Sequence, residues 1–97
     1  MSEASFITAE PREELARLHY YSIKKCQPAG DVEFIITVYE YAERNKQFMK
    51  FYARADKPVN QKSAAFVPFG WGETLTLALG ECVKEIRRYP YEPEGEA

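Results

Sequence analysis

The feature that most constrains the fold is a regular alternation of side chains between Val32 and Ala55. Phe34, Ile36 and Val38 fall on one side of an extended chain, and tyrosines and cations recur on the other side. A period of two residues is typical of a β-strand that covers a core. The polar run at 43–46 divides the segment into two strands of a hairpin. One hairpin face is therefore predicted to be core, and the other to be wet or covered by a partner.

A further strand is predicted before this hairpin, from Leu18 to Cys26, because aromatic and β-branched residues gather there. The alternative is a helix that continues to Cys26, since Leu15, Leu18, Ser22 and Cys26 could form one helical stripe. The residues at 27–30, Gln-Pro-Ala-Gly, form a natural turn. With Cys26 opposite Asp31, apolar residues meet apolar residues and opposite charges meet. The predicted pairs are Ile23–Phe34, Tyr21–Ile36, His19–Val38, Lys24–Glu33 and Tyr20–Thr37.

The same reasoning sets a register for the hairpin itself. With Ala42 opposite Gln47, each face of the second strand meets the matching face of the third. On the core face the predicted pairs are Val38–Phe51, Ile36–Ala53 and Phe34–Ala55. On the other face they are Tyr41–Phe48, Tyr39–Lys50, Thr37–Tyr52 and Ile35–Arg54.

The C-terminal third predicts an amphipathic helix that ends at Pro90. Gly80 inside it costs about 1 kcal/mol relative to Ala, which predicts a close approach to the sheet or to a partner. A short second helix is expected over 10–17, with Pro11 in its first turn. The residues of the C-terminal apolar stripe are Leu75, Leu79, Cys82, Ile86 and Tyr89, flanked by Ala78 and Val83.

The connection at 56–72 is longer than most loops in small domains, which makes it a candidate for function. An edge strand is expected near Ala65 to Val67. The run Phe69 to Gly72 is interpreted as a tight turn whose aromatic residues cap the core, with an anion-binding loop as the less favoured alternative. The candidate ligand residues in this region are Lys57, Asn60, Lys62, Gly70, Trp71 and Gly72.

Together these elements predict an α+β fold. It is a two-layer sandwich of a three-stranded, and with the edge strand four-stranded, antiparallel β-meander, with the C-terminal helix packed on one face and a short N-terminal helix. Residues 1–9 are expected to be a flexible arm, 10–90 a single domain and 91–97 an acidic, disordered tail.

Composition argues against several classes of function. Two cysteines and one histidine, His19, are too few for a disulfide framework or a self-contained zinc site, and no catalytic set is recognisable. We therefore expect no metal, no cofactor and no enzymatic activity. No apolar run reaches the roughly 20 residues of a membrane span, and the N-terminus does not resemble a secretory signal, so a cytoplasmic location is expected.

The face of the sheet opposite the core carries the functional hypotheses. Tyrosine combines apolar area with a hydroxyl and is favoured at protein interfaces, so a homo-oligomer or another protein partner is the first hypothesis. Bases also stack on exposed rings beside cations, so single-stranded nucleic acid is the alternative, although a net charge of −2 opposes it. The residues expected to act on this face are Tyr20, Lys24, Ile35, Tyr39, Tyr41, Phe48, Lys50, Tyr52 and Arg54.

Overall fold

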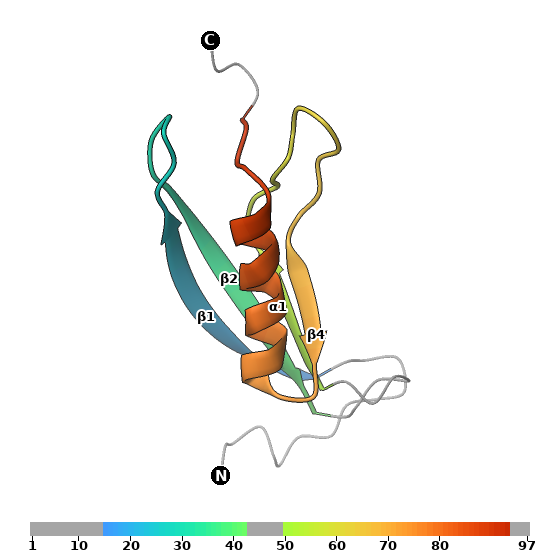
Figure 1. Cartoon of the computed structure of the whole chain (residues 1–97). Coiled ribbons are helices and arrows are strands. Elements are labelled where there is room, and N and C mark those ends of the chain that lie inside the picture. The colour runs from blue at the N-terminus through green and yellow to red at the C-terminus, as the bar shows by residue number, and fades with distance from the viewer. Residues whose placement is uncertain (1–14, 43–49, 94–97) are drawn as a thin grey trace.

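The computed structural model describes residues 15–42 and 50–93, which form one antiparallel sheet and one helix (Figure 1). The strands follow one another in the order β1-β2-β3-β4, so each is hydrogen-bonded to its neighbour in the chain. The helix lies across one face of this sheet. The elements are β1 (Ala16–Lys25), β2 (Val32–Tyr41), β3 (Phe51–Ala55), β4 (Phe69–Gly72) and α1 (Leu75–Arg88).

The predicted α+β fold with a C-terminal helix on an antiparallel sheet is confirmed. The expected helix over 10–17 falls largely outside the described residues, and its last two residues, Ala16 and Arg17, belong to β1 instead. The expected arm over 1–9 also lies outside the described residues.

The register of β1 against β2 is the one predicted from the pattern. Ile23 lies opposite Phe34, Tyr20 opposite Thr37 and Lys24 opposite Glu33. The turn closes with the Gly30 N–H donating to the Gln27 carbonyl oxygen at 2.9 Å, and Gly30 takes a positive φ of 133°. Apolar matching across ten residue pairs is enough to fix this register, because a shift of one residue would turn the core side chains outward.

The predicted register of β2 against β3 is wrong by two residues. Val38 lies opposite Ala53, and Ile36 opposite Ala55. A shift of two residues keeps every side chain on its own face, so the period-two pattern cannot distinguish the two registers. The observed register places Tyr39 directly beside Tyr52.

The fourth strand is β4, and the expectation of an edge strand near Ala65 to Val67 is wrong. That region contributes only an isolated bridge between Val59 and Phe66. The run from Phe69 to Gly72 is a strand rather than a turn, and its aromatic side chains do not cap the core. They point away from α1, whereas Gly70 and Gly72 face it.

Gly70 and Gly72 allow the helix to lie directly on the strand. A Cβ added at Gly70 would fall 2.5 Å from the Ala78 carbonyl oxygen, and one at Gly72 would fall 2.6 Å from the Ala78 backbone nitrogen. The prediction that Gly80 marks a close approach is wrong, because a Cβ there would meet nothing within 4 Å. The tight contact instead uses glycines on the strand side, where glycine is known to permit close backbone approach.

The core lies between α1 and the sheet. The predicted helical stripe is confirmed, since Ala78, Cys82 and Ile86 are buried against the apolar face of β2 and β3. The Cys82 thiol donates to the Pro68 carbonyl oxygen at 3.5 Å, and burial raises its pKa to about 12, so it behaves as a small core residue. Thr74 caps the helix by accepting a hydrogen bond from the Leu77 N–H.

The C-terminal end of α1 is tied to the turn end of the sheet. The Lys25 ammonium donates to the carbonyl oxygens of Ile86 at 2.8 Å and Tyr89 at 2.6 Å, which places a cation at the negative end of the helix dipole. Burial lowers the pKa of Lys25. The chain then continues to Tyr91, whose ring packs edge-on against Phe34 at 5.9 Å. Residues 91–93, expected in the tail, thus lie against the folded body.

The close contact between β4 and α1 predicts opposite outcomes for two glycine substitutions. Gly70→Ala would force a Cβ into helix backbone that cannot move aside, so we expect a loss of about 3 kcal/mol in the free energy of unfolding. Gly80→Ala removes an entropic cost at an open helical position, so we expect a gain of about 1 kcal/mol. Urea denaturation of both variants measures the two values. Equal effects would contradict the tight packing of α1 on β4.

Candidate functional site on the aromatic face of the sheet

The sheet face turned away from α1 is an apolar, largely aromatic surface, here called the aromatic face. Alternation along each strand decides which residues belong to it, because every second side chain points away from the helix. No described helix covers it. Its apolar members are Leu18, Tyr20, Ile35, Tyr39, Tyr41, Tyr52, Phe69 and Trp71.

An unbroken apolar row crosses all four strands on this face. Leu18 of β1 lies opposite Tyr39 of β2, Tyr39 lies opposite Tyr52 of β3, and Tyr52 lies opposite Trp71 of β4. The row is continuous because the β1–β2, β2–β3 and β3–β4 registers each place an apolar residue of this face opposite the next one. Cross-strand apolar pairs of this kind are the usual unit of sheet stabilisation.

The rings of the aromatic face touch one another. Tyr52 is at the centre, with its ring centroid 4.5 Å from that of Trp71, 5.9 Å from Tyr39 and 6.2 Å from Phe69. Tyr41 stacks with Trp71 at 6.4 Å and with Tyr39 at 6.1 Å. Centroid separations of 4.5–7 Å are typical of favourable aromatic pairs. The rings therefore hold each other in place and present a continuous surface.

That surface remains accessible to solvent. Tyr20 is 64% exposed, Phe69 50%, Leu18 43% and Trp71 39%. Large apolar side chains are normal singly at protein surfaces, but a contiguous group of them usually marks a binding site.

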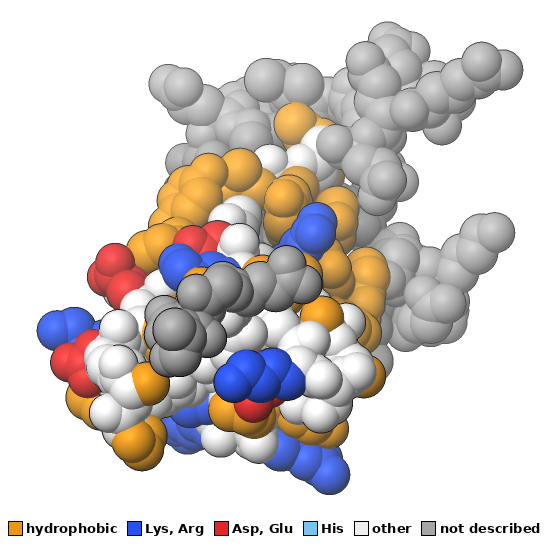
Figure 2. Space-filling model, turned by 90° about the horizontal axis from the view of Figure 1, so that it is seen from above, with side chains coloured by type: hydrophobic (Ala, Val, Ile, Leu, Met, Phe, Trp, Pro, Cys, Tyr) orange, Lys and Arg blue, Asp and Glu red, His pale blue; other side chains and the backbone are white. Residues whose placement is uncertain are grey.

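Most of the charge on and around the aromatic face is balanced. Lys24 lies directly opposite Glu33, and the Lys50 ammonium is 3.7 Å from a Glu40 carboxylate oxygen. Arg54 is exposed and has no ion-pair partner among the described residues. Figure 2, which views the turn end of the molecule, shows separate blue groups set among white, red and orange at that end. On the aromatic face Lys24 is balanced by Glu33, so among the described residues Arg54 is left as an unpaired cation.

Strand alternation places seven of the nine predicted residues on this face and adds others. Lys50 precedes β3, and its ammonium pairs with Glu40, whose carboxylate is on the helix side of the sheet. Phe48 lies outside the described residues. Leu18 and Phe69 were missed, and Trp71 was assigned to a ligand loop. Phe69 and Trp71 belong to the aromatic face because 69–72 is a strand. The signal that identifies them is the pair of glycines at alternate positions, which leaves both aromatic side chains on the opposite side.

The six candidate ligand residues of the 57–72 region do not converge. The Lys57 ammonium donates to the Glu33 carbonyl oxygen at 2.6 Å and pairs with Asp56 at 2.9 Å. Asn60 takes a left-handed conformation with φ of 57°, and its N–H donates to the Pro90 carbonyl oxygen. Gly70 and Gly72 contact α1, whereas Trp71 is on the aromatic face. These residues build the fold rather than a shared site.

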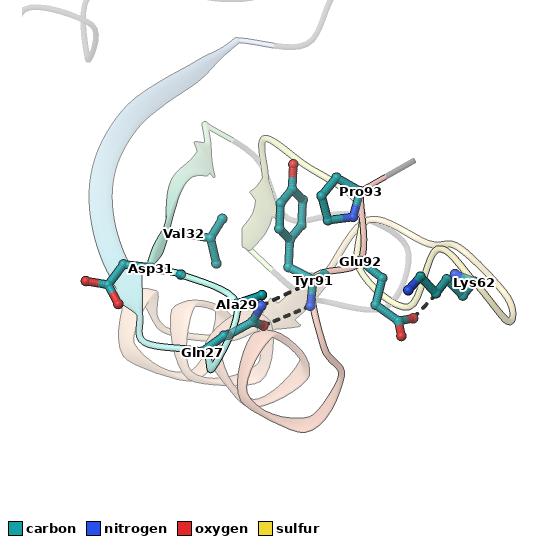
Figure 3. Close-up of a pocket in the computed structure, with 9 residues that line it drawn as sticks. Gln27, Ala29, Asp31, Val32, Lys62, Tyr91, Glu92 and Pro93 are labelled. Carbon is teal, nitrogen blue, oxygen red and sulfur yellow. Dashed lines mark hydrogen bonds between the residues drawn. The ribbon is translucent and has the colours of Figure 1, made fainter. Parts of the chain in front are cut away.

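A hollow of about 400 Å³ lies between the β1–β2 turn, the 60s loop and the segment at 91–93 (Figure 3). Three hydrogen bonds join residues that line it. The Gln27 carboxamide oxygen accepts from the Tyr91 N–H at 2.9 Å, its nitrogen donates to the Tyr91 carbonyl oxygen at 3.2 Å, and the Lys62 N–H donates to the Glu92 carboxylate at 3.3 Å. Asp31 points away from the hollow. No group of polar side chains is left converging on a ligand there.

His19 is partnered across the strands rather than in sequence. Its Nε2 lies 2.9 Å from a Glu40 carboxylate oxygen, on the helix side of the sheet. This hydrogen bond is the main cause of a lowered Glu40 pKa, with Lys50 and Arg17 adding to it against partial burial. The pair matches the expectation of a satisfied structural histidine. In the described parts of the chain no cluster of three metal-ligating side chains occurs.

Comparisons with protein-family models, curated proteins and solved structures gave no match. The described part of the chain has no helix long and apolar enough to cross a bilayer. The functional argument therefore depends on the aromatic face itself.

The lowered pKa of Glu40 predicts an acid-dependent contribution to stability. Because the folded pKa lies below its ordinary value of 4.5, ionised Glu40 stabilises the folded state above that pH, and the contribution disappears as pH falls through the folded pKa. The wild type should therefore be more stable than Glu40→Gln at pH 6, and the difference should shrink towards pH 3. Urea denaturation across this range tests it; a pH-independent difference would contradict the assignment.

Proposed function

We propose that this protein is a non-enzymatic interaction module that self-associates by packing the aromatic face of one copy against that of a second. The observation that carries the proposal is the apolar row Leu18–Tyr39–Tyr52–Trp71, which crosses every strand on a face that no described helix covers. A row of this kind adds nothing to the core beneath α1, so its natural role is to be buried by another surface.

The size of the face suits a small protein interface. The 29 strand residues, at about 3.4 Å per residue and about 4.8 Å between strands, give a projected area on the order of 470 Å². A stable interface buries roughly 600–1,000 Å² of accessible surface per partner, so the face lies just below that range. Tyrosine and tryptophan, which dominate here, are enriched in the cores of such interfaces.

The electrostatics are compatible with a second copy as the occupant. Lys24 opposes Glu33, and the Lys50 ammonium is paired with Glu40 on the helix side of the sheet. Among the described residues Arg54 is therefore the one cation of the face with no acidic residue opposite it, so two identical faces meet little repulsion when their Arg54 side chains stay apart. Two flat sheets pack face to face about 10 Å apart, with their side chains interdigitating. In a two-fold arrangement the apolar row of one copy lies over the same row of the other, and Arg54 remains towards the margin.

The single tryptophan of the chain provides a direct readout, since Trp71 is part of the row. Emission from Trp71 should shift to shorter wavelength with rising protein concentration, in step with dimer formation in sedimentation equilibrium. Phe69→Glu should weaken this dimer by about 100-fold, because it places a charge in an apolar interface. Leu77→Glu, at an exposed position on α1, is the matched control and should dimerise normally. A monomer with constant Trp71 emission at about 100 μM would overturn the proposal.

A second candidate function is single-stranded nucleic-acid binding by the same face. The observation that favours it is Arg54, which carries no ion pair among the described residues and lies directly opposite Phe69. Bases stack on such rings, and a nearby guanidinium attracts phosphate. The balanced Lys24 and Lys50 argue against it, because phosphate binding relies on several unpaired cations.

Titration with a single-stranded oligonucleotide at low salt separates the two functions. On the self-association proposal, Trp71 emission does not respond to the oligonucleotide. Quenching that declines steeply with salt and is abolished by Arg54→Glu, but not by Arg88→Glu at the far end of α1, would establish nucleic-acid binding instead.

A further inference from the structure

The outer edge of β1 is a second unpaired surface of the sheet. β1 is hydrogen-bonded to β2 on one side, and among the described residues no strand lies on its other side. The Ala42 N–H donates to the Leu15 carbonyl oxygen, which shows that odd-numbered residues of β1 face β2. The N–H and C=O groups that point to the open edge therefore belong to Ala16, Leu18, Tyr20, Ser22 and Lys24.

The middle of this edge lacks the features by which proteins usually block edge strands. Natural edges are protected by proline, charged side chains, bulges or short length. β1 is ten residues long, is paired without a bulge and contains no proline, and its charged residues Arg17, Lys24 and Lys25 lie near its two ends. Tyr20 and Tyr21, on opposite faces of the strand, are 64% and 38% exposed. Helix α1 leaves this part of the sheet uncovered because it packs mainly on β3 and β4.

We propose that β1 pairs antiparallel with β1 of a second copy, so that two sheets join into one continuous sheet of eight strands. The proposal concerns the backbone edge of β1 rather than the side chains of the aromatic face, and it stands whether or not that face self-associates. A two-fold axis perpendicular to the sheet relates the two strands, so each residue must lie opposite one on the same face. This condition is met only when one residue of β1 lies directly opposite its own copy. Each such register is named here as centred on that residue.

Charge and hydrogen bonding select the register centred on Tyr20. In that register Arg17 lies opposite Ile23, Lys24 opposite Ala16 and Lys25 opposite Leu15, so no like charges meet. All five outward-facing residues of each copy find a partner, and each of the five opposed pairs exchanges two hydrogen bonds.

The neighbouring registers are less favourable. A register centred on Tyr21 places Arg17 opposite Lys25, which brings like charges together. One centred on His19 leaves Lys24 without a partner inside β1. In the Tyr20 register, Tyr20 meets its own copy on one face and Tyr21 meets His19 on the other, which buries the two exposed tyrosines of the strand.

The experiment is a disulfide trap in the full-length chain. Tyr20→Cys is made in a Cys26→Ser background, which leaves Cys82 as the only other thiol, and Cys82 is buried. A hydrogen-bonded antiparallel pair holds its Cα atoms about 5.5 Å apart, within the range that a disulfide spans. Mild oxidation should therefore convert most of the protein to a covalent dimer. Ser22→Cys is the matched control, because its counterpart would lie about 14 Å away.

A proline variant tests the same contact without relying on cysteine. The Ser22 N–H points to the open edge, so Ser22→Pro removes an edge hydrogen bond and leaves the bonds to β2 in place. It should abolish the edge-paired dimer in sedimentation while its circular dichroism remains that of the wild type.

These experiments can contradict the proposal for the β1 edge and the proposal for the aromatic face independently of each other. Trp71, on β4, does not report on the edge contact. Adding Phe69→Glu to the Tyr20→Cys variant should leave its cross-linking unchanged, because Phe69 is on the aromatic face and not at the edge of β1. Equal cross-linking at positions 20 and 22, or none at either, would overturn the inference.

Discussion

The close packing of α1 on the glycines of β4 determines how the rest of the molecule is exposed. Gly70 and Gly72 let the helix backbone approach the strand to a distance that any side chain would prevent. An α-helix is about 10 Å across with its side chains, whereas four strands span about 19 Å. One helix therefore cannot cover all four strands equally, and the glycines place it nearest to β4 and β3. Because α1 lies mainly over β3 and β4, β1 is left at an uncovered margin.

The same glycines explain which parts of the fold the sequence predicts. The β1–β2 register follows from the pattern because ten residue pairs match in alternation on the two faces and a Gly-containing turn fixes their start. The β2–β3 register does not, because a displacement of two residues preserves both faces and the connection offers no comparable turn signal. β4 is missed for a different reason. Glycine usually lowers strand propensity, and only the position of α1 shows that the two glycines are contact residues.

The candidate site follows the same logic. Tyr39, Tyr41 and Tyr52 are recognisable from alternation alone, because they lie in strands whose period is clear. Phe69 and Trp71 require knowledge of β4, whereas Leu18 follows from the predicted β1–β2 register, which places it opposite Tyr39. Sequence thus predicts the part of the aromatic face on the first three strands and misses the part on β4. The apolar row becomes visible only when all three registers are known.

The aromatic face and the open edge of β1 would associate through different interactions, so both contacts can form in one assembly. The aromatic face offers side chains, whose burial is favourable but carries little directional information. The edge of β1 offers backbone groups, whose hydrogen bonds demand one direction and one register. A two-fold axis perpendicular to the sheet keeps both aromatic faces on the same side, so edge pairing would double the width of the apolar surface. Face-to-face packing uses an axis in the plane of the sheet, and two perpendicular two-fold axes generate a closed assembly of four copies. In such an assembly the described sheet buries both its aromatic face and its open edge against other copies of the same chain.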